Sequence, residues 1–391
     1  MSRRLFSLII ALSIILTSAG AVLAKDAYVV GFSAALTGQG SGSYAPIKDA
    51  FDIYFKAVNA KGCINGHPVK IIYSDNAAQP SKAAADAKRF ATQDKVILLL
   101  NASLSSTYAP MIQVAKRYKI PIFFAGGVCP SDVYPPKPAP LEFCATGFGF
   151  RYDSQFAIPF IKQTAKGPVK LALVAMNIPV SRAEMEYAAT LAKKDKDFTV
   201  TGIEAIPPPT PDYTPFATKI KNAGANWVYS WAPWVTEVKT LEALRKLGWQ
   251  GNYLAYCHNP AEQELERLKD DKFYVFGTNA LFADNTKMHQ EIKAASEKGK
   301  TIYPYQKLTG GWIFAMVLEK ILKGTPWPPT PAKVQKAMTD IKVNLGGLRG
   351  GSLVWTPTNH FRTLNYYRVY KWDSKANKIK LVKDWTPITV K

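Results

Sequence analysis

The sequence predicts an α/β protein with two lobes, each built around a parallel central sheet. Strands and helices alternate from residue 28 to residue 107, and the same alternation restarts after Phe150. Alternation of this kind is typical of parallel sheets covered by helices. The chain has 391 residues, 47% of them hydrophobic, which is enough for two domains with a core each. Two similar lobes joined by crossings of the chain indicate a protein that hinges.

Residues 1–24 have the pattern of a secretory signal peptide. Arg3 and Arg4 give it a basic start, residues 5–16 are almost wholly apolar, and small residues precede the expected cleavage site. The apolar stretch is too short to span a bilayer comfortably, which disfavours a membrane anchor. The first cysteine is Cys63, far from the cleavage site, which disfavours a lipid anchor. We therefore expect a soluble mature chain exported to the periplasm.

The first half starts with an apolar strand over residues 28–32, followed by a Gly/Ser-rich loop over residues 36–43. A helix comes next, because five apolar residues recur at the spacing of one buried helix face. They are Ile47, Phe51, Tyr54, Phe55 and Val58. The expected order continues with a strand over 69–73, a helix over 83–91, a strand over 96–100 and a second polar loop over 103–107. Because such loops gather at the carboxyl ends of the strands, the two polar loops should meet at one cleft.

The second half repeats this architecture with little sequence similarity. Its expected strands cover residues 171–175, 198–206, 227–231, 253–256 and 273–278, and its helices cover residues 182–194, 213–222 and 236–247. A Pro-rich loop is expected over residues 207–211 and a later helix over residues 309–322. Three C-terminal strands are expected over residues 353–355, 365–369 and 379–382. Gly147 and Gly149 lie near the first crossing between the lobes and are natural hinge residues.

The chain is strongly basic, with a formal net charge of +21. Removal of Arg3 and Arg4 with the signal peptide leaves +19. The lysines are scattered over helix faces and form no run of five basic residues, and export separates the protein from nucleic acid, so a nucleic-acid partner is not expected. A functional interpretation is that the positive field attracts small anions to the cleft.

The four cysteines are Cys63, Cys129, Cys144 and Cys257. Export permits disulfides, and Cys129 and Cys144 flank a Pro-rich loop that a disulfide between them would close. A second pair, Cys63 with Cys257, is disfavoured because the two residues are expected in different lobes. The spacings do not fit a zinc site, so no metal is expected.

Motifs of common enzymes are absent from the sequence. It contains no H-E-x-x-H, G-x-S-x-G or P-loop pattern, and its four histidines are isolated from one another. Residues 40–45 fit G-x-G-x-x-G/A after a strand, but the acidic residue expected about 20 positions later is missing, which disfavours a dinucleotide cofactor. We therefore expect no cofactor and no catalysis. An exported α/β hydrolase is the enzymatic alternative.

Several short motifs, taken together, resemble the periplasmic leucine/isoleucine/valine-binding protein family, the type I solute receptors of ABC importers. They are Gly31-Phe32-Ser33-Ala34-Ala35-Leu36-Thr37-Gly38, Val58-Asn59-Ala60-Lys61-Gly62-Cys63-Ile64-Asn65-Gly66, Tyr73-Ser74-Asp75-Asn76 and Lys119-Ile120-Pro121-Ile122. The resemblance covers the mature chain, more weakly in its second half.

The resemblance implies two Rossmann-like α/β lobes joined by a three-crossing hinge. Lobe 1 would comprise residues 25–146 and 279–350, and lobe 2 residues 147–278 and 351–391. A small solute would bind between the lobes, which close on it, and the closed receptor would dock on the membrane permease of an ABC transporter. A monomer is the default for such receptors.

The resemblance also implies ligand contacts in the first lobe. Ser105, Ser106 and Thr107 match the hydroxyl-rich loop that holds a ligand carboxylate, where hydroxyls and a helix N-terminus supply hydrogen-bond donors; plain helix capping is the alternative. Gly126 and Gly127 match positions whose backbone groups contact the ligand, with a simple turn as the alternative. Tyr44 matches an aromatic wall position, unless it packs within its helix.

In the second lobe, Trp231 and Trp234 follow a strand at the cleft side and could stack on an apolar or aromatic ligand. Burial against neighbouring helices is the alternative. Tyr256 and His258 end the next strand and are further candidates for ligand contact.

Two departures from the family pattern bear on the ligand. Val128 stands where amino-acid binders commonly have a hydroxyl residue, and residues 256–259 lack the acidic residue that pairs with a ligand ammonium. An unpaired ammonium in a cleft would cost several kcal/mol. The expected ligand is therefore an aromatic or other apolar carboxylate first and a branched-chain amino acid second, with a neutral amide or urea-like solute also open. A sensor that reports solute capture to a signalling partner is the alternative to transport.

Overall fold

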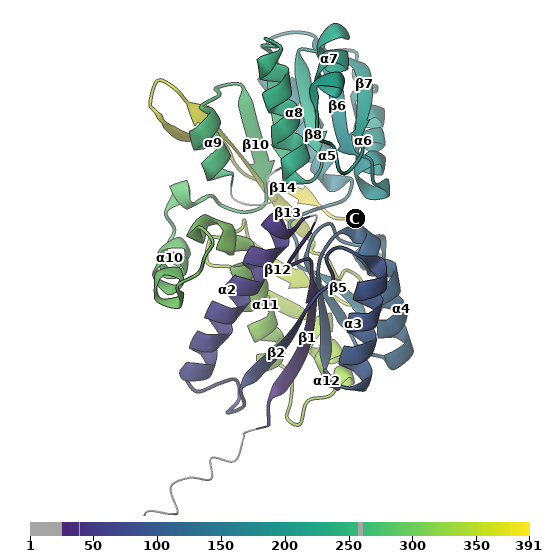
Figure 1. Cartoon of the computed structure of the whole chain (residues 1–391), viewed down its shortest axis with the longest axis vertical. Coiled ribbons are helices and arrows are strands. Elements are labelled where there is room, and N and C mark those ends of the chain that lie inside the picture. The colour runs from purple at the N-terminus through teal and green to yellow at the C-terminus, as the bar shows by residue number, and fades with distance from the viewer. Residues whose placement is uncertain (1–25, 39, 257–260) are drawn as a thin grey trace, which may run out of the picture.

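The structure is a computed structural model that describes residues 26–38, 40–256 and 261–391. The expected signal peptide, Cys257 and His258 lie outside these residues. Figure 1 shows two lobes stacked along the long axis of the molecule, with the chain passing between them near the middle. Within the described residues, no helix is both long and apolar enough to cross a membrane.

Lobe 1 contains a five-stranded parallel sheet in the order β2-β1-β3-β4-β5. Its strands are β1 (Tyr28–Ala34), β2 (Val69–Asp75), β3 (Leu98–Ala102), β4 (Ile122–Gly126) and β5 (Glu142–Cys144). Its helices are α2 (Ser41–Ala60), α3 (Pro80–Thr92), α4 (Tyr108–Tyr118), α10 (Lys287–Gly299), α11 (Thr309–Lys323) and α12 (Pro331–Thr339). A two-stranded sheet of β11 (Ile341–Asn344) and β12 (Ser352–Trp355) completes it.

Both faces of this sheet are covered, as its strands of near-continuous apolar residues require. Alternate residues such as Val30 and Phe32 pack on one face against α2 and α11, while Leu99 and Phe124 pack on the other against α3 and α4. Helices α2 and α11 approach closely, because a Cβ at Gly311 would lie 2.6 Å from the Cβ of Ala50. The two helices therefore form one rigid wall beside the sheet.

Lobe 2 contains a seven-stranded sheet in the order β14-β13-β10-β9-β8-β6-β7. Its strands are β6 (Val169–Met176), β7 (Phe198–Ile206), β8 (Trp227–Trp231), β9 (Asn252–Tyr256), β10 (Phe273–Gly277), β13 (Leu364–Asp373) and β14 (Lys378–Thr389). Its helices are α5 (Tyr152–Thr164), α6 (Pro179–Ala192), α7 (Thr214–Asn222), α8 (Trp234–Lys246) and α9 (Glu262–Leu268). Helices α5 and α6 cover one face, and α7 and α8 cover the other.

The second lobe repeats the strand order of the first. Strands β7-β6-β8-β9-β10 are parallel and follow the order of β2-β1-β3-β4-β5, while β13 and β14 extend the sheet in antiparallel fashion. In each lobe the strand order reverses beside the first strand, and the carboxyl ends around such a switch point are where α/β sheets bind ligands. The α/β class, the parallel sheets and the copied architecture are as the sequence predicts.

Three segments connect the lobes near residues 145–149, 278–279 and 362–364. The third comes after β12, which pairs with β11, and after Trp355, which packs against Phe123 and Phe143 in the lobe 1 core. Residues 352–355 therefore associate with lobe 1 rather than with lobe 2.

Cys129 and Cys144 form a disulfide, the pairing that the sequence favours. It joins the loop after β4 to the end of β5, directly before the first crossing. The disulfide and the buried Val133 between its two cysteines hold the Pro-rich loop against the α3–α4 side of the lobe 1 core.

Candidate ligand-binding site

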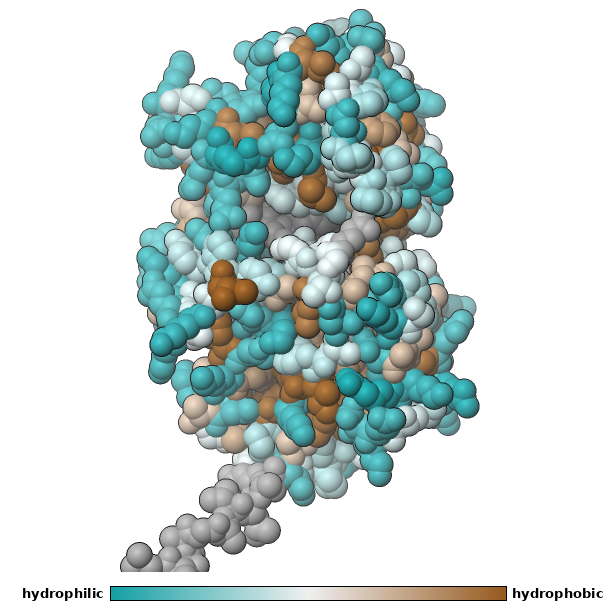
Figure 2. All heavy atoms as spheres, in the orientation of Figure 1, coloured by the Kyte–Doolittle hydropathy of each residue, from teal (hydrophilic) through white to brown (hydrophobic). Residues whose placement is uncertain are grey.

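A cleft lies where the carboxyl ends of the two sheets face each other, and Figure 2 shows the surface hollowed at this level. At its centre is a cavity of about 50 Å³ lined by both lobes. It continues into two wider grooves of about 580 and 590 Å³. Small-molecule sites usually measure several hundred Å³, so a solute must occupy part of a groove or enter before the lobes approach fully.

The loops of lobe 1 at the cleft are tied together by two side chains of the motif that ends β2. The Asp75 carboxylate accepts backbone hydrogen bonds from Leu36 (2.9 Å) and Thr37 (3.2 Å). Burial alone would raise the pKa of Asp75, but these bonds, with those from the Thr37 hydroxyl and Ala77, lower it. Buried Asn76 donates to the hydroxyl of Ser33 (2.9 Å) and accepts from that of Ser103 (2.9 Å). The ends of β1, β2 and β3 are thereby locked.

Tyr44 stands in the second turn of α2 and is almost fully buried against Gly126 and Gly127. A Cβ at Gly126 would lie 3.1 Å from the Tyr44 ring. Gly127 has φ +75, and a Cβ there would lie 2.5 Å from the Tyr108 hydroxyl. Both glycines therefore let two tyrosines approach the backbone, and they line the cleft together with Tyr44.

The hydroxyl-rich loop after β3 divides into three environments. Ser105 is half-buried and lines the central cavity. Ser106 is exposed and lines the groove beside it. Thr107 is buried and its side chain is engaged in local hydrogen bonds. Its hydroxyl donates to the Leu104 carbonyl (2.8 Å) and accepts from the Asn101 side chain (3.1 Å). Of the three residues, Ser105 has the placement that suits a ligand contact.

The lobe 2 wall of the central cavity is formed by Trp231 with Ile178 and Val180. Trp231 is buried, and its indole N–H donates to the Asp153 carboxylate at 2.8 Å. Ile178 and Val180 stand at the start of α6, at the carboxyl end of β6. Val128 of lobe 1 faces this wall and packs against the lobe 2 core. The cavity is therefore mainly apolar.

The remaining candidates from lobe 2 are spread along the cleft. Trp234 is half-buried, lines a wide groove and packs near Phe273, with ring centroids 6.2 Å apart. Tyr256 is buried and stacks on Phe148 at 4.4 Å in a second, adjacent cavity. His258 lies outside the described residues.

Acidic groups of lobe 2 are buried behind the wall. Glu237 accepts backbone hydrogen bonds from Ala232 (3.3 Å) and Tyr256 (3.2 Å) and so fixes two strand ends beside the cleft. Burial raises the pKa of Glu237 well above its usual value, and burial followed by the charge of Glu184 does the same for Asp153. Neither side chain is among the described residues that line the central and adjacent cavities.

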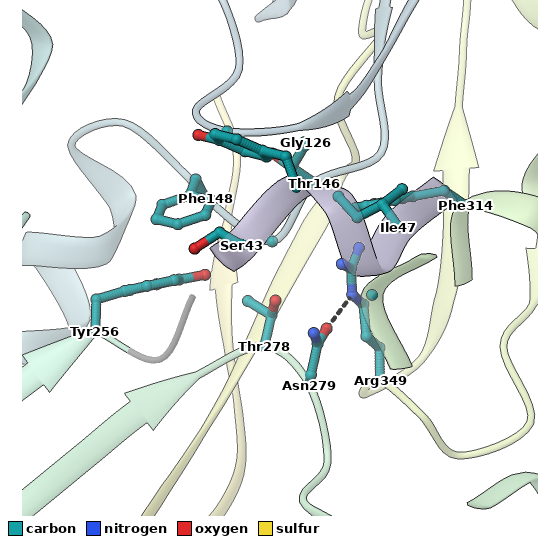
Figure 3. Close-up of a pocket in the computed structure, with 14 residues that line it drawn as sticks. Ser43, Ile47, Gly126, Thr146, Phe148, Tyr256, Thr278, Asn279, Phe314 and Arg349 are labelled. Carbon is teal, nitrogen blue, oxygen red and sulfur yellow. Dashed lines mark hydrogen bonds between the residues drawn. The ribbon is translucent and has the colours of Figure 1, made fainter. Parts of the chain in front are cut away.

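The adjacent cavity, of about 40 Å³, lies at the hinge end of the cleft and shares Ser43, Tyr44 and Gly127 with the central one. Figure 3 shows Tyr256 and Thr278 pointing into it from lobe 2, and Arg349 reaching toward α2 from below. The Arg349 Nε donates to Asn279 at 2.6 Å. Residues of the first and second crossings, Thr146 to Phe148 and Thr278 with Asn279, thus meet Arg349 here.

Sequence reasoning missed several residues of these cavities, among them Ile178, Val180, Thr278, Asn279 and Arg349. Thr278 ends one predicted strand and Ile178 lies three residues after another, so the rule that ligands gather at carboxyl ends could have found them. Arg349 carries no comparable local signal, because a later segment of the chain brings it to the hinge.

Within the described residues, no group of three or more His, Cys, Asp or Glu residues could hold a metal ion. The cleft offers hydroxyls, backbone groups and aromatic faces, which can bind and orient a solute. A nucleophile with an adjacent base is not among the described residues that line the central cavity.

Comparison with known proteins identifies a matching family model and a related protein sequence. A family model described as "Periplasmic binding protein" matches residues 27–377. An amino acid binding protein of Pseudomonas aeruginosa is 23% identical over 334 residues, which cover 82% of this chain and 83% of that protein.

Solved structures share the fold. A solute-binding protein of an ABC transporter from R. palustris, in complex with 4-hydroxybenzoate, has a TM-score of 0.77 at 15% identity, covering 93% of this chain and 98% of that one. A branched-chain amino acid ABC transporter protein from Thermus thermophilus, with bound valine, has a TM-score of 0.77 at 18% identity, covering 94% and 97%. The likeness thus includes receptors for two kinds of carboxylate.

Proposed function

The chain belongs to the periplasmic binding protein family, and from this premise we propose that it is the substrate-binding component of an ABC importer for an aromatic or other apolar carboxylate. The solute would be captured between the lobes and trapped by their closure, without any bond being made or broken. A branched-chain amino acid is the second candidate.

The observation that carries the proposal is the composition of the central cavity. Its apolar wall of Val128, Ile178, Val180 and Trp231 faces the hydroxyl of Ser105 and the backbone at Gly127. Apolar surfaces with a few placed polar groups are typical of small-molecule sites. An apolar body against Trp231 and a carboxylate at Ser105 would use both parts of the cavity.

The lining disfavours an α-amino acid. An ammonium group that leaves water needs a carboxylate partner, and without one it costs several kcal/mol. The described lining of the central cavity holds no Asp or Glu, and residues 257–260, Cys-His-Asn-Pro, supply none either. A carboxylate without an ammonium group avoids this cost and is favoured by the basic balance of the protein.

The proposal also includes the export of the protein, its permease partner and its oligomeric state. The family is periplasmic and works with ABC permeases, and we infer that residues 1–24 are removed on export to the periplasm. The mature receptor would act as a monomer and without nucleic acid, and its permease would recognise the closed form.

A thermal-shift panel tests the ligand class. The probes are benzoate, 4-hydroxybenzoate, leucine and valine, with benzamide as the matched neutral control. A ligand at 100 times its dissociation constant stabilises the folded protein by about 2.7 kcal/mol. We expect a large shift with at least one aromatic acid and a small one with benzamide.

Two other outcomes would count against the proposal. A large shift with leucine and none with the aromatic acids would overturn the ligand class but keep solute capture. A binding solute that leaves the radius of gyration in small-angle scattering unchanged would contradict capture by lobe closure.

A further inference from the structure

We propose that Arg349 forms a subsite for a carboxylate-sized anionic group at the hinge end of the cleft. The inference rests on the proposed function, because it assigns a second polar contact within the same cleft. The anionic group belongs either to the captured solute or to a separate small carboxylate.

Arg349 has the placement of a binding residue. It is 5% exposed and lines the cavity that Ser43, Gly310 and Thr278 also line. Its Nε donates to the Asn279 side chain at 2.6 Å, and its Nη1 donates to the Ala145 carbonyl. Its Nη2 has no hydrogen-bond partner within the described part of the chain. The in-plane N–H groups of Nη2 are therefore available to a ligand.

The charge of Arg349 is not balanced by an acidic side chain. Among the described residues its charged neighbour is a second buried arginine, Arg362, and no acidic side chain raises its pKa. Arg362 donates to the carbonyls of Ala145 and Thr146 and to Asn365 (2.9 Å). Burial first, and Arg362 second, lower the pKa of Arg349 well below its usual value. Buried charges are normally paired, so an anion in this cavity would relieve a cost already present in the fold.

The size and lining of the cavity indicate the kind of group. Its volume of about 40 Å³ has room for a few heavy atoms, which suits a carboxylate group. The hydroxyls of Ser43 and Thr278 line it and can donate to the same anion. Arginine with hydroxyl donors is the usual recognition set for a carboxylate.

The position of the cavity couples an anion to the hinge. Arg349 bonds to Ala145 at the first crossing and to Asn279 at the second, while the cavity shares Tyr44 and Gly127 with the solute cavity. A solute in the central cavity can extend an acidic group along this shared lining. A separate small anion would bind beside the solute instead.

Acetate and its neutral isostere acetamide are the probes that test the subsite. Melting temperatures are measured at constant ionic strength for the wild-type protein, Arg349→Gln and Arg362→Gln. Arg362 is a matched control because it is a buried hinge arginine outside the cavity lining. We expect acetate to raise the melting temperature of the wild type and of Arg362→Gln more than acetamide does, and to have no such advantage in Arg349→Gln.

Two results would overturn the subsite. The first is that acetate still raises the melting temperature of Arg349→Gln more than acetamide does. The second is that acetate and acetamide have the same effect on the wild type, a result that does not depend on any variant folding. In either case an aromatic acid that still shifts the wild type would leave the proposed function intact.

Competition between acetate and 4-hydroxybenzoate distinguishes the two sources of the anion. Mutual exclusion in calorimetric titrations would assign the subsite to the acid group of the solute. Independent or cooperative binding would assign it to a separate small carboxylate.

Discussion

The indole Nε1 of Trp231 donates a hydrogen bond to the Oδ2 of Asp153 at 2.8 Å. The other oxygen of Asp153 accepts from the Tyr367 hydroxyl (2.6 Å) and from the Gly149 amide (3.1 Å). Gly149 follows the first crossing and Tyr367 follows the third. One buried carboxyl group therefore joins the aromatic wall of the cleft to two of the three connections between the lobes.

Replacing Trp231 with phenylalanine tests this link. Phenylalanine keeps an aromatic ring, but a buried oxygen of Asp153 loses its donor and the smaller phenyl fills less of the buried site, so we expect the free energy of unfolding to fall by at least about 1–3 kcal/mol. Urea denaturation measures the change. Trp234→Phe is the control, because Trp234 packs its ring against Phe273 at the rim of the cleft. Equal losses in the two variants would mean that the hydrogen bond to Asp153 contributes little.

Glu184 makes the stability depend on pH. It accepts hydrogen bonds from the Ser154 hydroxyl and amide and from the Arg151 amide, yet burial outweighs these bonds and raises its pKa to about 7. The raised pKa means that folding favours the protonated form. This contribution is complete below the unfolded pKa, about 4.5, and is lost as the pH rises through about 7.

We therefore expect the wild type to lose about 3 kcal/mol relative to Glu184→Gln between pH 4.5 and pH 8. Chemical denaturation across this range gives the difference, in which the pH effects of groups that do not feel the charge of Glu184 cancel. Glu186→Gln, on the exposed face of the same helix, should run parallel to the wild type. A Glu184→Gln curve parallel to the wild type would show that this carboxyl does not titrate differently in the folded protein.

The fold could be predicted because its signals are local. Strands such as 227–231 and 198–206 are apolar or β-branched runs between turn residues, and their predicted bounds match β8 and β7. Helix α5 was missed because most of its faces are buried, from Asp153 to Ile161, which removes the amphipathic pattern on which helix prediction depends. The pairing of β12 with β11 depends on a hairpin rather than on composition, so the sequence offers little signal for the chain's course there.

Residues of the candidate site could be predicted from the sequence where they lie at the end of a strand or in the loop directly after it. Ser105 and Gly127 follow β3 and β4, and Trp231 ends β8; all three line the central cavity. The buried acids Asp153 and Glu184 and the hinge residue Arg349 owe their environments to contacts between distant segments. Such contacts leave no pattern in a single sequence.

Ser105 and Ser106 should differ sharply in ligand binding, although they are neighbours. Ser105 lines the central cavity, whereas Ser106 is exposed at a groove. Loss of a hydroxyl donor to a carboxylate costs about 1.5 kcal/mol, or about tenfold in affinity. Calorimetric titration with the aromatic acid that shifts the protein most should show this loss in Ser105→Ala and less than about a twofold change in Ser106→Ala. Equal affinities in both variants would remove Ser105 from the site.

Gly147 is required for close packing rather than for an unusual backbone conformation. It has no positive φ, but a Cβ there would lie 1.9 Å from the Thr278 Oγ1 and 2.9 Å from the Tyr256 hydroxyl. The first and second crossings therefore touch at this point. Gly147→Ala should lower the free energy of unfolding by about 1–3 kcal/mol through this overlap.

A double-mutant cycle separates that overlap from a general effect of alanine at a hinge. Thr278→Ala removes the nearest atom, so it should recover part of the loss caused by Gly147→Ala, with an interaction energy of at least about 0.5 kcal/mol. Gly167→Ala is the control, because its added Cβ meets no atom within 4 Å and should change stability by less than about 0.5 kcal/mol. Additive losses at Gly147 and Thr278 would show that alanine acts there through the backbone of the hinge. The glycine would then serve motion between the lobes and not the contact between two crossings.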